Sequence, residues 1–168
     1  MPAASYFEER VLFSPNLPVA INQLLQSAVT LTPVDKAQAE RLFKQAQALD
    51  SDCLQTYFAL YKFYFFQGRL LEAEREVLAG LATAARQGGF PVDYHQLTSQ
   101  PKQWDMYASE STLFYLYTLK ALAFIQLRLQ QTAAAQTILH ALETLDPEDR
   151  IGASVIRSLS QALTQEAV

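Results

Sequence analysis

The stretch from Leu54 to Arg86, LQTYFALYKFYFFQGRLLEAEREVLAGLATAAR, decides the fold expected for this chain. Two segments in it have apolar residues at helical spacing, and Gln67-Gly68-Arg69 separates them as a turn. Between positions 57 and 66, seven of ten residues are aromatic. A helix buries aromatic rings on all its sides only when neighbouring elements cover it from several directions. We therefore expect the rest of the chain to supply those neighbours.

Composition limits the class of protein. The chain has 168 residues, of which 50% are hydrophobic and 18% charged, which is typical of a globular domain with a core. The net charge is -4 and no basic stripe occurs, so a nucleic-acid partner is not expected. A single cysteine, Cys53, excludes an internal disulfide and a CxxC metal site.

The chain also lacks the signals of export or membrane insertion. Acidic residues precede the first apolar run, so residues 1–13 do not resemble a secretory signal. No segment approaches the roughly 18 uncharged apolar residues of a membrane span, and the aromatic segment contains Lys62. We expect a cytoplasmic protein without a membrane partner.

The periodicity predicts helices throughout and no strand of useful length. Expected helices run from about 18 to 31, 33 to 49, 52 to 67, 70 to 86, 109 to 129, 132 to 145 and 147 to 164. The fourth of these helices is expected to face the core with Ala73, Val77, Leu78 and Leu81. The last is expected to do so with Ile151, Val155, Ile156, Leu159 and Leu163. Residues 1–17 form an apolar lead-in, and 88–108 form an irregular insert.

Helix ends are predicted from local residue types. Thr32 is expected to cap the helix that follows, with Pro33 at its first position. The segment 50–52 should cap the aromatic helix, and Gly68 should end it in a left-handed conformation. Asp146-Pro147 should open the last helix in the same manner as Thr32-Pro33.

Small and large residues recur with a period of 34 residues. Ala39 and Ala73, Phe43 and Val77, and Ala46 and Gly80 are each separated by this distance. In the middle helix pair, the residues at the positions of the repeat motif are Tyr57, Leu60, Tyr64, Gly68, Ala73, Val77 and Gly80. This pattern resembles the tetratricopeptide-repeat family. It departs from the family motif at Tyr61, where a small residue is usual, and lacks the proline that follows the second helix.

The resemblance implies an all-α fold over 1–168, with antiparallel helix-turn-helix pairs stacked as a short right-handed superhelix. About three pairs, at 18–50, 52–87 and 109–146, would be followed by a capping helix at 147–165. An ordinary helical bundle with a chance period is the other interpretation.

Proteins of this family usually bind peptides on a concave surface lined by the first helix of each pair. We take the matching positions in this chain, together with Trp104 of the insert, as the predicted partner-binding residues. These positions are Gln55, Phe58, Lys62, Phe65, Phe66, Leu24, Tyr115 and Leu122. This surface is apolar, and it lacks the several basic residues with which some members hold carboxylates. It therefore suits an apolar or amphipathic segment.

Two functional interpretations follow. One is a protein-interaction module, either an adaptor or an assembly chaperone, whose protein or peptide partner binds this groove. The other is a structural scaffold or homodimer in which the 88–108 insert closes the groove, because aromatic residues at helical spacing are usually core.

Catalytic, metal and cofactor sites are not expected. His95 and His140 are the only histidines, and the sequence identifies no nucleophile beside either. Cys53 begins the aromatic helix, but most such cysteines are small buried residues. No phosphate-binding loop, zinc-protease or nucleophile-elbow motif occurs.

Overall fold

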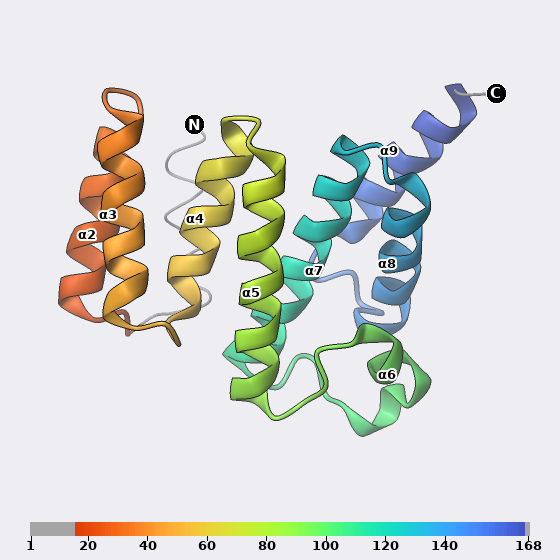
Figure 1. Ribbon diagram of the computed structural model, residues 1–168. Helices are drawn as coiled ribbons and strands as arrows, with labels where there is room; N and C mark the ends of the chain where they lie inside the picture. The colour runs from red at the N-terminus through yellow and green to blue at the C-terminus, as the bar shows by residue number, and fades with distance from the viewer. Residues whose placement is uncertain (1–15, 167–168) are drawn as a thin grey trace. The chain divides into compact units, whose positions relative to one another are not determined.

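The computed structural model describes residues 16–166, and every regular element in that range is helical (Figure 1). The expected packing of the N-terminal lead-in falls almost entirely outside this range. The chain forms two compact units, Met1–Thr83 and Ala84–Val168, and the division falls within a single helix. The all-α class expected from periodicity is thus confirmed, while the superhelical stacking of repeats stays a prediction.

The first unit begins with helices α2 (Val19–Leu31) and α3 (Lys36–Leu49), joined by a short turn and packed together. Helix α4 (Leu54–Phe66) packs on α3, and Gln67–Arg69 leads from it into α5 (Leu70–Gly88). The small residues of the 34-residue period, Ala39, Ala46 and Ala73, are all fully buried. Their small size allows the helix backbones to approach closely.

The second unit contains α6 (Tyr94–Ser99) and a short 3-10 turn (Pro101–Gln103) within the segment expected to be irregular. Helix α7 (Glu110–Arg128) packs on α8 (Thr132–Leu145), and α9 (Ala153–Glu166) packs on both. Helix α6 packs on α8. The insert therefore holds local helical structure that its lack of period did not reveal.

Neighbouring elements cover most of the aromatic helix, a point that the two functional interpretations had left open. Five of its rings are at most 9% exposed: Tyr57, Phe58, Tyr61, Phe63 and Tyr64. The C-terminal end differs, because Phe66 is 64% exposed. Gly68 has φ of 73°, which confirms the predicted left-handed residue after the helix.

Three predicted helix starts are wrong. Residues 50–52 do not cap α4, whose N-cap is Cys53 and which has no side-chain cap hydrogen bond among the described residues. The α3 cap is Asp35, whose carboxylate accepts from the backbone N–H of Gln38 at 3.1 Å, whereas Thr32 ends α2 with its hydroxyl on the Ala28 carbonyl. Asp146-Pro147 does not open α9, which starts at Ala153. Asp146 instead holds a turn, since its carboxylate accepts from the N–H groups of Arg150 and Ile151, each at 2.9 Å.

Two predicted inward faces are also partly wrong. On α5, Ala73, Val77 and Leu81 are buried, but Leu78 is 51% exposed. On α9, the predicted residues Val155, Leu159 and Leu163 are 64%, 47% and 51% exposed. Because α9 begins six residues later than expected, a different side of it meets α7 and α8.

Candidate interaction surface

The predicted partner-binding positions of the first unit lie mainly on one side of α4. Gln55, Phe58, Lys62 and Phe65 follow one another at three- or four-residue spacing, so they share a helical face. Exposure rises along this face from the start of the helix to its end. Gln55 and Phe58 are 0% and 1% exposed, Lys62 and Phe65 are half-buried, and Phe66 beside them is 64% exposed.

The side chain of Gln55 is the least satisfied polar group on this face. Its Oε1 and Nε2 atoms are both buried, and neither has a hydrogen-bond partner within the part of the chain that the structure describes. A buried primary amide ordinarily pairs with protein or water, because leaving it unpaired costs about 1–3 kcal/mol. Both the donor group and the acceptor group of the Gln55 amide are therefore available to pair with a further group.

The other end of the α4 face carries an aromatic pair and a cation. The rings of Phe65 and Phe66 meet edge to face, with centroids 5.5 Å apart and planes at 85°. The Lys62 ammonium lies 4.4 Å from the Phe58 ring centroid, in cation–π geometry. Exposed aromatic rings held in a fixed orientation are frequent anchors of protein–protein contacts.

Leu24, the predicted contact residue of the first pair, is half-buried on α2 between the fully or nearly buried Ile21 and Leu25. Its apolar neighbours thus belong to the core of the helix pair.

In the second unit, the predicted residues Tyr115 and Leu122 are 0% and 6% exposed on α7. The insert covers Tyr115: its hydroxyl donates to the Val92 carbonyl, and Phe90 meets its ring edge to face at 5.1 Å. Burial, followed by the charge of Asp93, raises the pKa of Tyr115. Trp104, also in the insert, is half-buried.

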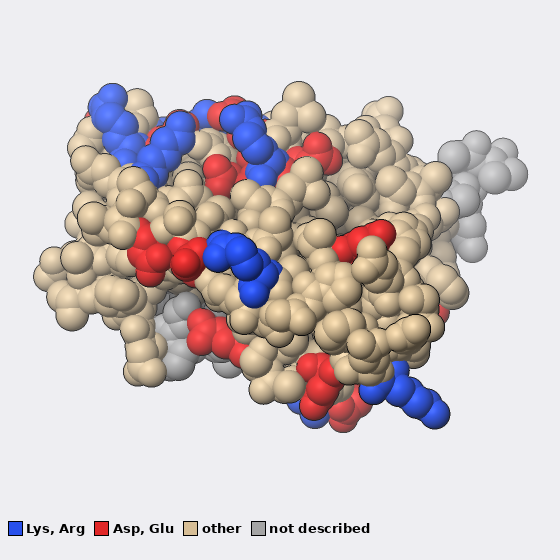
Figure 2. Space-filling model, turned by 60° about the horizontal axis from the view of Figure 1, so that its bottom comes forward, with Lys and Arg blue, Asp and Glu red and all other residues tan. Residues whose placement is uncertain are grey.

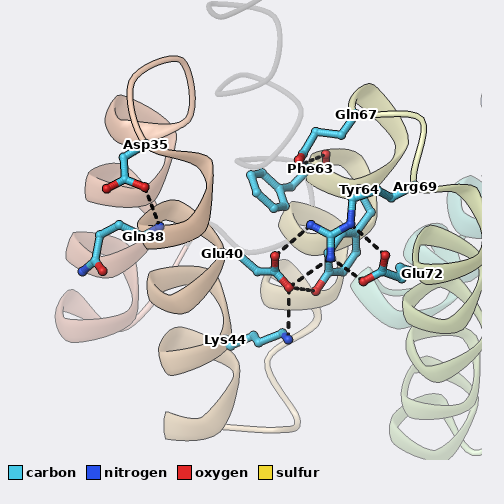
Figure 3. A network of polar contacts seen from close by, with 9 residues as sticks. All are labelled: Asp35, Gln38, Glu40, Lys44, Phe63, Tyr64, Gln67, Arg69 and Glu72. Atoms are coloured by element: carbon cyan, nitrogen blue, oxygen red, sulfur yellow. Dashed lines mark hydrogen bonds and ion pairs between the residues drawn. The ribbon is translucent and has the colours of Figure 1, made fainter.

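A polar cluster that the sequence did not suggest joins three helices of the first unit (Figure 3). Glu40 of α3 accepts two hydrogen bonds from the Arg69 guanidinium, at 2.8 and 3.3 Å, and one from the Tyr64 hydroxyl at 3.0 Å. Lys44 lies 3.1 Å from the same carboxylate, and Arg69 Nε donates to Glu72 at 2.7 Å. Periodicity could not show it, because Glu40 and Arg69 are 29 residues apart and neither lies on an apolar face.

The electrostatics of this cluster follow from these contacts. Hydrogen bonding to Arg69 lowers the pKa of Glu40 to about 2, more than burial raises it. The same guanidinium lowers the pKa of Glu72. Burial, together with the bond to Glu40, raises the pKa of Tyr64. Glu40, Glu72 and Tyr64 are thus held in their ordinary charge states, which is typical of a structural network rather than of acid–base catalysis.

The histidines lie apart from these residues. His95 Nδ1 lies 3.0 Å from Asp93 Oδ1, and its ring stacks on Tyr94, but both members of the His–Asp pair are exposed. His140 is 3.6 Å from Glu143 on the exposed side of α8. Within residues 16–166, no group of three or more His, Cys, Asp or Glu side chains is placed to hold a metal ion. Cys53 is the half-buried residue that precedes α4.

The charges on the face drawn in Figure 2 form small groups of both signs, separated by uncharged surface. None of the helices described is long and apolar enough to cross a membrane.

Comparison with protein-family models, with curated proteins and with solved structures finds no match in any of the three.

Proposed function

We propose that this chain is a protein-interaction module, an adaptor or assembly chaperone, which binds an apolar or amphipathic peptide segment along the α4 face. The tetratricopeptide-like period motivates the class. The observation that carries the proposal is the buried Gln55 amide, which has no partner among the described residues.

A peptide group matches Gln55 chemically. A primary amide offers two N–H donors and a carbonyl acceptor in one plane, and a peptide backbone offers the complementary acceptor and donor. Phe58, one turn further along, and the exposed Phe66 make the remainder of this face apolar. An apolar segment would therefore contribute buried area at the aromatic end. It would form hydrogen bonds at Gln55 once it displaced the groups that cover this buried amide.

The experiment selects peptides from a random library with the purified full-length chain and measures their dissociation constants by fluorescence polarisation. Phe66→Asp places a charge on the exposed end, and we expect it to weaken binding at least about tenfold, since hot-spot residues contribute more than about 1.4 kcal/mol. Leu71→Asp is the matched control, because Leu71 is 68% exposed and Phe66 is 64% exposed.

Gln55→Met separates binding from folding. Methionine has a similar length but no polar atoms, so it should stabilise the fold by about 1–2 kcal/mol if the amide is unpaired in the free chain. The same change should weaken peptide binding about tenfold. A loss of stability in this variant, measured by urea unfolding, would show that Gln55 is already paired and would contradict the proposal.

A structural scaffold is the second candidate, and the cover of Phe90 and Val92 over Tyr115 favours it. Under that interpretation the insert occupies the peptide-binding face of the second unit. The selection would then return no peptide for the wild-type chain, whereas Phe90→Ala, which removes part of the cover, would gain binding.

A further inference from the structure

Helix α9 exposes three of its large apolar residues, while Ile156 is half-buried. Ala153 and Ser160, on the side that packs against α7 and α8, are 1% and 2% exposed. Val155, Leu159 and Leu163, which we call the α9 ridge, are 64%, 47% and 51% exposed. A helix with one side in water normally exposes polar residues on that side, because an exposed apolar side chain does not gain the free energy of burial.

The spacing of the α9 ridge is symmetric about its central residue. Val155 lies four residues before Leu159, and Leu163 lies four residues after it. Residues four apart form one of the ridges by which helices interdigitate. When a second α9 lies antiparallel on the first, Leu159 meets Leu159 of the other copy, and Val155 meets Leu163.

The charges around the ridge also suit self-association. A two-fold contact brings each residue near its own copy or a symmetric position, so a self-complementary surface has to avoid like charges. Between Ser154 and Leu163, Arg157 is the only charged residue, and its Nε lies 3.4 Å from Glu143 of α8. The exposed residues that flank the ridge, Ser158, Gln161 and Ala162, are uncharged.

We propose that the α9 ridge is the contact surface of a homodimer, formed by two α9 helices packed antiparallel about a two-fold axis at Leu159. A single helical ridge offers less area than the roughly 800 Å² per partner of a standard interface, so the dimer should be weak and depend on concentration. This inference does not depend on peptide binding along α4.

Sedimentation velocity of the full-length chain, over micromolar to millimolar concentrations, tests the proposal. We expect a monomer–dimer equilibrium in the wild type. Leu159→Glu and Leu159→Lys should each be monomeric, because each would bring two like charges together at the axis. An equimolar mixture of the two variants should recover the dimer, because the axis would then hold one charge of each sign.

Leu78→Glu is the matched control, since Leu78 on α5 is 51% exposed and its change should leave the dimer intact. Circular dichroism checks that each variant keeps its helicity. A wild type that stays monomeric throughout, a dimer that survives both Leu159 changes, or a control that also dissociates would overturn the proposal. Failure of the mixed variants to associate would overturn the two-fold pairing at Leu159.

Discussion

At the scale of single residues, Glu40 links the fold of the first unit to pH. Its pKa is lowered to about 2 from an ordinary 4.5, mainly because Arg69 donates to it. A carboxylate with a lower pKa in the folded state contributes stability above its unfolded pKa, and that contribution is lost as the pH falls through the folded value. The sensitive window for Glu40 therefore runs from about pH 4.5 down to about pH 2.

Glu40→Gln should accordingly destabilise the protein by about 1–2 kcal/mol at pH 7, a figure reduced from the full linkage value because the cluster is partly open to water. The difference from the wild type should shrink between pH 4.5 and pH 2, because the unfolded chain takes up a proton at Glu40 from about pH 4.5, whereas the folded chain does so only near pH 2. Urea unfolding at a series of pH values measures both effects. A difference that stays constant down to pH 2 would contradict the assigned pKa.

At the scale of elements, the turn between α8 and α9 depends on Asp146. This carboxylate is 4% exposed and accepts from two backbone N–H groups and from the Tyr107 hydroxyl, which attaches the insert to the turn. Burial, together with the bond to Asp146, raises the pKa of Tyr107 to about 12. The guanidinium of Arg150 lies 4.0 Å from the Tyr107 ring centroid.

Asp146→Ala should leave these N–H groups without their acceptor and destabilise the second unit by about 2–3 kcal/mol. Hydrogen exchange at the amides of Arg150 and Ile151 should become faster, which nuclear magnetic resonance measures directly. Glu148→Ala changes an exposed acid of the same turn and should have little effect. Equal effects of the two changes would contradict the role assigned to Asp146.

The same turn shows how far sequence reasoning reaches. Local periodicity was enough to predict α8 as 132–145, because apolar residues at helical spacing need a common core. It did not decide whether the rings of α4 are core or binding surface, and most of them prove to be core. An Asp-Pro pair, however, can either cap a helix or close a turn. The backbone conformation of the residues that follow it determines which of the two forms. Here Asp149 has φ of 52° and Gly152 φ of 77°, so the chain turns before α9 starts. The predicted α9 face was wrong for this reason.

The candidate site was predicted less completely than the helices. Spacing correctly placed Gln55, Phe58 and Lys62 on one face of α4, but it does not report what covers that face. Phe58 proves to be 1% exposed and Phe66 64% exposed. The Glu40–Arg69 contact depends on the distance between helices far apart in sequence, which no local pattern contains.

At the scale of the whole molecule, the boundary between the two compact units falls inside α5, at Thr83. A helix is a cooperative element, since its hydrogen bonds span four residues and form together. Circular dichroism reports on helices of both units, whereas Trp104, the only tryptophan, reports on the second. We expect both signals to give the same urea midpoint in the wild type. Two separated midpoints would show that α5 does not couple the units.

The amide of Gln55, buried and unpaired within the described part of the chain, has a consequence for which residues selection favours at position 55, in nature and in the laboratory. If its amide contributes only when a peptide is bound, the residue is a compromise between folding and recognition. A saturation library at this position, sorted once for folded protein and once for peptide capture, would then enrich apolar residues in the first sort and glutamine in the second. The same library could be extended to every codon. Positions where the sort for folding and the sort for peptide capture enrich different residues would outline the recognition surface before any partner is identified.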